Sequence, residues 1–222
     1  MTGSSSAVGW LPARDAAPRF AGIAVVGILN VTPDSFSDGG SNPTADAAAD
    51  RAVAMLDAGA AVIDVGGEST RPGSRFVGEA EELRRVIPAV EAILARRPEA
   101  AISVDTRKSA VARAALEAGA RIVNDVSALA DDPDMAAVCA ESGAAVVLMH
   151  MQGTPATMQD DPRYADAVPQ IADWLRARVK IAVDAGMERS KIIVDPGIGF
   201  GKRLEDNLAL IARLDADRKS VV

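Results

Sequence analysis

The chain has 222 residues, of which 49% are hydrophobic and 25% are charged, and its formal net charge is −7 at pH 7. This composition is that of a globular protein, and the length suits one domain or at most two. An acidic chain without a tract of Lys and Arg is a poor candidate for sequence-independent nucleic-acid binding or for an anionic membrane surface. The only cysteine, Cys139, excludes an intramolecular disulfide and a cysteine-based zinc site, and the only histidine, His150, excludes motifs that need two.

The apolar runs are too short for a membrane-spanning helix. The longest, such as Ile23–Leu29, have about seven residues, whereas about 20 are needed to cross a bilayer. The first 20 residues have no basic stretch followed by an apolar core, so no secretory signal is indicated. We therefore expect a cytoplasmic enzyme with a flexible N-terminal segment at residues 1–20, which are rich in Ser, Gly, Ala and Pro.

From residue 21 onward, short apolar runs rich in Val and Ile alternate with Ala-rich segments whose apolar residues recur at helical spacing. The runs lack polar–apolar alternation, which is typical of strands buried on both faces of a parallel sheet. Asp132-Pro133 indicates the start of a helix, and the glycines at 59, 119, 143 and 186 follow predicted helices, where a left-handed residue is favoured. The predicted strands are Ile23–Leu29, Ala61–Val65, Ala101–Val104, Ile122–Val126, Ala144–Met149 and Ile192–Val194, and the predicted helices are Thr44–Ala58, Glu79–Arg96, Ser109–Ala118, Pro133–Ser142, Ala165–Ala185 and Leu204–Asp215.

Repeated βα units indicate an α/β fold with a parallel sheet. No G-x-G-x-x-G follows the first strand, and polar and Gly-rich residues follow nearly every strand. Both features favour a (β/α)8 TIM barrel over a doubly wound sheet. Only about six βα units are present where a barrel has eight, in a chain shorter than the usual length of about 250 residues. We therefore expect an incomplete barrel over residues 21–216.

Carboxylates and carboxamides follow the predicted strands, at the end of the sheet where a barrel builds its active site. Asp105, Asn124 and Asp195 come from three different strands and suit a flat heterocycle with several N–H donors and one carbonyl. Each alone could be a turn residue or a helix N-cap, but three in register favour ligand binding. His150 follows a buried strand and is more typical of a buried, hydrogen-bonded histidine than of a catalytic one. Cys139 lies in a predicted helix among apolar residues and is typical of a core residue.

The loops after the first two strands have about a dozen residues, a length typical of lids over a site. Lys202 and Arg71 are lone basic residues in loops, a setting more typical of solvated side chains than of anion contacts.

Two long segments closely resemble the signatures of dihydropteroate synthases: GILNVTPDSFSDGG at residues 27–40 and DVGGESTRPG at residues 64–73. Shorter matches follow in the family's order, namely SVDT at 103–106, NDV at 124–126, LMHMQG at 148–153 and DPGIGFGK at 195–202. These enzymes join 4-aminobenzoate to 6-hydroxymethyl-7,8-dihydropterin diphosphate, releasing diphosphate and making 7,8-dihydropteroate for folate synthesis. Sulfonamides compete with the aminobenzoate. The resemblance implies the same transferase activity.

The resemblance also implies a role for each matching residue. Asp105, Asn124 and Asp195 would be the catalytic residues that hold the pterin, with Met149 packing on the same pocket. Asn30 would ligate the Mg²⁺ that accompanies the diphosphate. The aminobenzoate site and its two closing loops would be formed by Phe36, Asp38, Thr70, Arg71, Pro72, Gly199 and Phe200.

The chemistry implied is largely dissociative, because diphosphate leaves first and the amine then captures a pterin methylene cation. Mg²⁺ stabilises charge on the leaving group, and Asp195 stabilises the cationic pterin.

The end of the chain departs from the family pattern. The family continues with a seventh strand ending in Ser-Arg-Lys-Ser and an eighth ending in Arg-x-His. Asp217-Arg-Lys-Ser220 resembles the first of these only superficially, because a predicted helix runs into it without a strand. We therefore expect residues 217–222 to be a non-native tail and this exact chain to be poorly stable and inactive, since two sheet edges would be open. The resemblance also implies a homodimer for the full-length enzyme.

Two other functions are compatible with a pterin clamp. One is a pterin-binding methyltransferase domain that passes a methyl group from a folate to a corrinoid; the two long loops argue against it. The other is a non-catalytic paralogue that binds pterin or a partner. The two intact long loops of this chain argue against such divergence, whereas the absence of the seventh and eighth strands favours an inactive protein.

Overall fold

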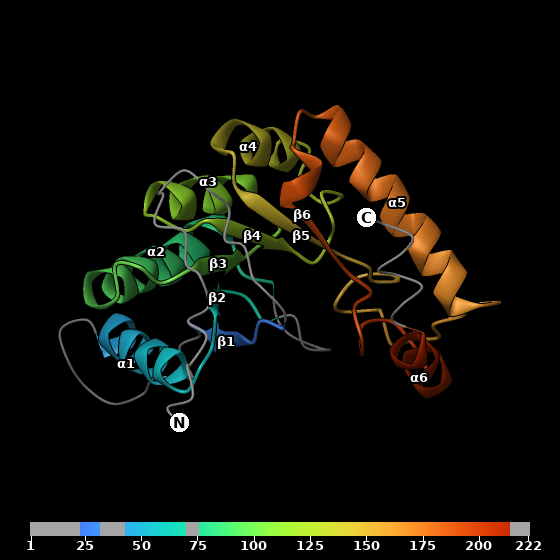
Figure 1. Ribbon diagram of the computed structural model, residues 1–222, viewed down its shortest axis with the longest axis horizontal. Helices are drawn as coiled ribbons and strands as arrows, with labels where there is room; N and C mark the ends of the chain where they lie inside the picture. The colour runs from blue at the N-terminus through green and yellow to red at the C-terminus, as the bar shows by residue number, and fades with distance from the viewer. Residues whose placement is uncertain (1–22, 32–42, 70–75, 214–222) are drawn as a thin grey trace, which may run out of the picture.

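The computed structural model describes residues 23–31, 43–69 and 76–213 of the chain. Strands and helices alternate along it (Figure 1). The elements are β1 (Val26–Asn30), α1 (Pro43–Asp57), β2 (Val62–Gly66), α2 (Glu79–Arg96), β3 (Ile102–Asp105), α3 (Ser109–Glu117), β4 (Ile122–Asp125), α4 (Met135–Ser142), β5 (Ala145–Met149), α5 (Ala167–Asp184), the 3-10 helix η2 (Arg189–Lys191), β6 (Ile192–Asp195) and α6 (Leu204–Ala212).

The described strands form one six-stranded sheet in the order β1-β2-β3-β4-β5-β6. Every neighbouring pair is parallel. A doubly wound sheet reverses its strand order at a switch point, whereas this order is strictly sequential, as in a barrel. The helices α1 to α5 follow one another in an arc outside the strands (Figure 1). The predicted fold class, a barrel-type α/β sheet with six βα units, is confirmed.

The main core lies between the sheet and the helices. Alternate strand residues face opposite sides, so Ile63, Val65 and Val104 face the helices and are fully buried. The opposite, inner face has a smaller apolar cluster that includes Ile122 and Ala145. This arrangement leaves every second position near the strand ends free to face the inside of the curved sheet, where a site can form.

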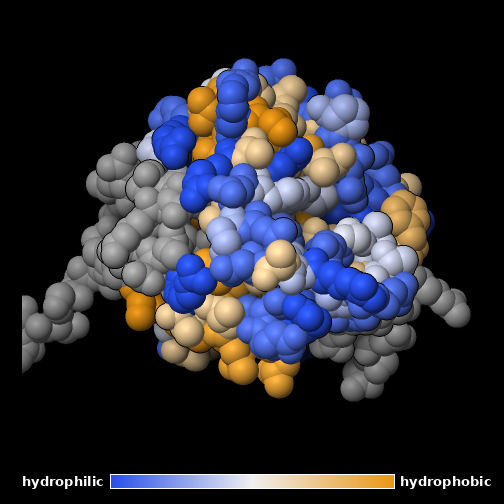
Figure 2. All heavy atoms as spheres, turned by 90° about the vertical axis from the view of Figure 1, so that its right-hand side faces the viewer, coloured by the Kyte–Doolittle hydropathy of each residue, from blue (hydrophilic) through white to orange (hydrophobic). Residues whose placement is uncertain are grey.

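The inner face is exposed at both edges of the described sheet. On β1 the exposed fractions are 49% for Val26 and 67% for Ile28, and on β6 Ile193 is 45% exposed. The face at the α5–α6 end is mainly hydrophilic with separate hydrophobic patches (Figure 2). On α6, the side chains of Leu204, Leu208 and Ile211 are all more than half exposed. No helix among the described residues is long and apolar enough to cross a membrane.

Most predicted boundaries agree with the structure within two residues, but two ends differ by three residues. β1 begins at Val26, three residues after the predicted start, and α6 ends at Ala212, three residues before the predicted end at Asp215. Residues 1–22 and 217–222 lie outside the described residues. α4 begins at Met135 after the N-cap Asp134. Asp132 instead accepts a hydrogen bond at 2.7 Å from the backbone N–H of Ser109, the first residue of α3. The four predicted helix-ending glycines all have positive φ, between 67° and 115°.

Candidate active site

Residues at the carboxyl ends of four neighbouring strands, β1 to β4, form one row. Asn30 pairs with Gly66, Gly66 with Asp105, and Asp105 with Asn124. Residues paired across a parallel sheet face the same side, so these side chains share the inner face. Gly66 leaves a gap in the row, because a Cβ atom there would lie 3.4 Å from Oδ2 of Asp105 and 3.6 Å from Oδ1 of Asn30. The two oxygens therefore flank the same spot.

Asp195 and Met149 stand one inward-facing position further along the sheet. The register pairs Asn124 with Val147, and Met149 with Asp195. The two residues are thus on the same face as Asn124 and nearer the mouth. Oδ1 of Asp195 accepts a hydrogen bond at 2.7 Å from the backbone N–H of Gly197. The carboxylate keeps part of its surface exposed and can still accept from a ligand.

A further carboxylate lies beneath the row. The side-chain N–H of Asn124 donates to Oδ2 of Asp64 at 2.9 Å, and Ser103 also hydrogen bonds to this carboxyl. Asp64 is buried, and its Oδ1 has no partner among the described residues. Burial raises the pKa of Asp64, and these two hydrogen bonds partly oppose the rise. Sequence reasoning missed this role, although Asp64 opens the second long motif.

Asp105 lies among other acids. Its pKa is raised well above the usual value, first by burial and then by the charges of Asp64, Glu82 and Asp125, while Arg107 acts in the opposite direction. An ionised carboxylate in this setting is stabilised by N–H donors. Asp105 is therefore suited to a ligand that presents such donors, as a pterin ring does.

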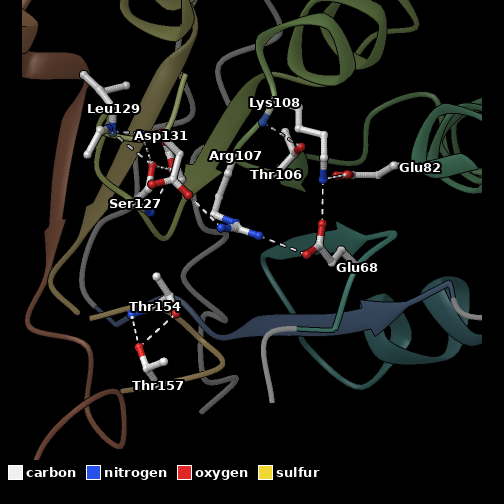
Figure 3. A network of polar contacts seen from close by, with 12 residues as sticks. Glu68, Glu82, Thr106, Arg107, Lys108, Ser127, Leu129, Asp131, Thr154 and Thr157 are labelled. Atoms are coloured by element: carbon white, nitrogen blue, oxygen red, sulfur yellow. Dashed lines mark hydrogen bonds and ion pairs between the residues drawn. The ribbon is translucent and has the colours of Figure 1, made fainter. Parts of the chain in front are cut away.

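An ion-pair network joins the loops that follow β2, β3 and β4 to α2 (Figure 3). Lys108 contacts both Glu68 and the fully buried Glu82, and Arg107 contacts both Glu68 and Asp131. One oxygen of Glu82, Oε1, has no partner among the described residues. A cavity of about 10 Å³, room for about one water, is lined by Glu68, Glu82, Asp105, Thr106, Arg107 and Val126.

The loop after Asn124 is held in an unusual conformation. The carboxylate of Asp125 accepts hydrogen bonds from the backbone N–H groups of Ser127 and Leu129, both at 2.8 Å. Ala128 and Leu129 have positive φ, 52° and 66°, which is costly for residues with side chains. Arg178 of α5 donates to the carbonyl of Ala128 at 2.6 Å. These bonds hold the backbone that follows Asn124.

Three interpretations of single residues are tested by the structure. Cys139 is a buried core residue, as expected, and burial raises the pKa of its thiol to about 12. The expectation that Lys202 is solvated is wrong, because it is 4% exposed and donates to backbone carbonyls. The expectation of a hydrogen-bonded His150 ring is also wrong at Nδ1, which is buried without a partner among the described residues. The ring instead packs edge-on against Trp174, with centroids 4.9 Å apart.

Two of the expected aminobenzoate-site residues, Gly199 and Phe200, lie in the turn that follows Asp195. The other expected loop residues lie outside the described residues: Phe36, Asp38, Thr70, Arg71 and Pro72.

Comparison with known proteins agrees with this geometry. The model of a family described as "Pterin binding enzyme" matches residues 26–221. The chain belongs to this family. It is 50% identical over 190 residues to dihydropteroate synthase of Escherichia coli K12, covering 86% of this chain and 67% of the relative. With dihydropteroate synthase of Bacillus subtilis it shares 49% identity over 191 residues, or 64% of that relative.

Solved structures give the same result. The chain superposes on Xanthomonas albilineans dihydropteroate synthase with 4-aminobenzoic acid with a TM-score of 0.79, at 46% identity, over 86% of this chain and 67% of that one. For Burkholderia cenocepacia dihydropteroate synthase complexed with 7,8-dihydropteroate the TM-score is 0.78, at 42% identity, over 90% of this chain and 68% of that one. The chain thus spans about two thirds of these relatives. The comparisons favour the synthase over the methyltransferase and the non-catalytic paralogue.

Proposed function

We propose that the chain provides the pterin-binding wall of a dihydropteroate synthase, the transferase that condenses 6-hydroxymethyl-7,8-dihydropterin diphosphate with 4-aminobenzoate. The observation that carries the proposal is the row Asn30, Gly66, Asp105 and Asn124, with Asp195 one step nearer the mouth. Its acceptors and one donor complement the edge of a flat ring that carries N–H groups and a carbonyl.

Each residue of the row has a distinct task. Asp105 and Asp195 accept N–H groups of the pterin, and their negative charge stabilises the cation that forms when diphosphate leaves. Asn124 presents its carbonyl oxygen and its second side-chain N–H to the ring, because its other N–H donates to Asp64. The thioether of Met149 packs beside the ring on the same face. Gly199 and Phe200 form the base of the aminobenzoate site, where the amine attacks the methylene carbon.

Asn30 suits a magnesium ion that arrives with the diphosphate. Its Oδ1 faces the row beside Gly66. The described residues contain no cluster of three His, Cys, Asp or Glu side chains that could hold a metal ion. Mg²⁺ is usually bound by few protein oxygens together with substrate phosphates and water, and one amide oxygen fits that pattern. When bound, Mg²⁺ would stabilise the negative charge of the departing diphosphate.

We further propose that the full-length enzyme is a cytoplasmic homodimer. The exposed apolar side chains of α6, at Leu204, Leu208 and Ile211, support a protein contact there. Light scattering of a version completed to eight βα units, with and without Leu208→Glu, tests the dimer. A monomer in both would contradict it.

The proposed function is tested by binding and by turnover. Fluorescence titration with the pterin diphosphate should show binding to the 222-residue chain, and Asp105→Asn should weaken it about 100-fold. Labelled aminobenzoate and Mg²⁺ are then added, and labelled pteroate is sought with this chain and with the eight-unit version. Absence of pterin binding and of pteroate in both would refute the proposal. Pteroate made by the shorter chain would instead refute the sequence-based expectation that it is inactive.

A further inference from the structure

The turn that carries Gly199 and Phe200 is built around three residues with left-handed backbone. Gly197, Gly199 and Gly201 have φ values of 66°, 86° and 59°. At two of them a side chain has no room, because a Cβ atom on Gly197 would lie 2.1 Å from the carbonyl oxygen of His150, and one on Gly201 would lie 2.7 Å from that of Gln152. The turn is therefore pressed against the segment that follows β5.

A buried lysine fills the inside of this turn. Nζ of Lys202 donates to the carbonyl oxygens of Gly197 and Phe200, both at 2.8 Å, and to that of His150 at 3.0 Å. Two of these carbonyls belong to the turn and the third to the segment after β5. The same ammonium group thus closes the turn and fastens it to the neighbouring strand end.

Lys202 could bind the substrate or position the turn, and the bonds of its three N–H groups distinguish these two roles. A protonated lysine has three donors and no acceptor, and each donor already has a backbone carbonyl. No donor remains for a substrate oxygen or phosphate. A substrate-binding or nucleophilic role would require the cage to open, whereas a positioning role requires only the bonds that the structure shows.

Other side chains bond to further backbone groups of the turn. The hydroxyl of Tyr164 donates to the carbonyl of Gly201, and the side-chain N–H of Gln159 donates to that of Gly199, both at 2.8 Å. The N–H of Gly199 donates to Oδ1 of Asn207 at 2.8 Å. Lys202 is the most buried of these side chains and makes the largest number of bonds to the turn.

We propose that Lys202 is a positioning residue for the aminobenzoate site, whose caged ammonium group fixes the turn at residues 197–201 and thereby the place of Phe200. This inference rests on the proposed function for its ligand, but the anchoring of the turn does not. The three bonds of Lys202 go to backbone carbonyls and none goes to a side chain of the pterin row. Its links to that row are indirect, through the bond between Gly197 and Asp195 and through the charge of Asp195, so its loss affects the aminobenzoate end of the ligand more than the pterin end.

The experiment compares two ligands on the 222-residue chain. 6-Hydroxymethylpterin occupies the pterin site alone, whereas 7,8-dihydropteroate occupies both sites. Lys202→Met should weaken dihydropteroate about tenfold, as expected for loss of charge-assisted hydrogen bonds, and should leave hydroxymethylpterin within about twofold. Hydrogen exchange at the amides of Gly199 and Phe200 should become faster. Lys191→Met is the matched control, since Lys191 stands at the opposite end of β6 and, among the described residues, has one ion pair, with the exposed Glu188; it should change neither quantity.

A second variant keeps the test valid if Lys202→Met does not fold. Tyr164→Phe removes one hydroxyl and its bond to Gly201, and should shift both measurements in the same direction by a smaller factor. Unchanged exchange and unchanged dihydropteroate affinity in a folded variant would overturn the inference, and so would equal weakening of both ligands. If wild type binds neither ligand, the proposed function fails, and the exchange measurement alone then decides whether Lys202 anchors the turn.

Discussion

Asn124 donates its side-chain N–H to the buried carboxylate of Asp64 across 2.9 Å. An amide can present either its oxygen or its nitrogen to a ligand, and this bond selects the orientation with the oxygen free. Asp64, which lies on β2 one inward-facing position before Gly66, thus determines which atoms of Asn124 face the inside of the sheet. Sequence reasoning identified Asn124 but not the residue that orients it.

Asp64→Ala is therefore expected to weaken 6-hydroxymethylpterin binding about tenfold, although Asp64 lies beneath the row. Without the carboxylate, the side-chain N–H of Asn124 loses its partner, and the amide of Asn124 can rotate freely. Calorimetric titration checks this. Asp206→Ala serves as control, since it removes another buried aspartate, on α6, that pairs with Arg203. Equal affinity of Asp64→Ala and wild type for the pterin would contradict the orientation argument.

Asp105→Asn is expected to lower pterin affinity by about 100-fold, because the ring loses a charged acceptor, and at the same time to stabilise the fold at pH 8. The folded-state pKa of Asp105 is raised by burial and by neighbouring acids. A carboxyl of this kind costs stability once the pH exceeds its unfolded pKa, and the cost is greatest above the folded pKa. Urea unfolding at pH 8 and pH 4 checks the sign. If Asp105→Asn is less stable than wild type at pH 8, then hydrogen bonds or positive charges stabilise the ionised Asp105 more than the structure indicates.

The fold was predictable because its signals are local. Each β-strand reads as a short Val- and Ile-rich run, and helices such as Ser109–Glu117 end before a glycine with positive φ. The gathering of Asp105, Asn124 and Asp195 at one end of the sheet was predictable because the carboxyl ends of parallel strands lie at the same edge. Glu82 was not, since it looks like a solvated acid on an amphipathic helix, and only the packing of α2 on α3 shows that it is buried beside Lys108. The prediction that Lys202 is solvated was wrong for a similar reason, because the three carbonyl groups that bind its ammonium group come together only when the turn at residues 197–201 has formed.

Lys108→Met is expected to destabilise the fold by about 3 kcal/mol, because it leaves Glu82 charged and buried without its cation. Glu82→Leu in the same chain should recover most of that loss, since an apolar pair of similar volume replaces the ion pair. Urea unfolding of wild type, both single variants and the double variant gives the coupling between the two residues. Additive losses within about 0.5 kcal/mol would show that the pair is not coupled.

His150 should make the fold sensitive to acid. Burial, together with the charge of Lys202, lowers the pKa of its imidazole from 6.5 to about 4. The unfolded chain therefore takes up a proton at this residue between about pH 6.5 and 4 while the folded chain does not, and stability falls as the pH falls through that range. At pH 4.5 the loss attributable to His150 is about 2 kcal/mol relative to pH 7.

His150→Phe keeps an aromatic ring against Trp174 and removes the titrating group. The free energy of unfolding of this variant, minus that of wild type, should therefore increase by about 2 kcal/mol between pH 7 and pH 4.5. The carboxylates of the chain are present in both proteins, so their contributions cancel in the difference. Urea melts at several pH values, followed by the fluorescence of Trp174, provide the measurement. A difference that stays constant with pH would mean that the imidazole of His150 is protonated as readily in the folded chain as in the unfolded one, so that its buried Nδ1 has an acceptor in solution.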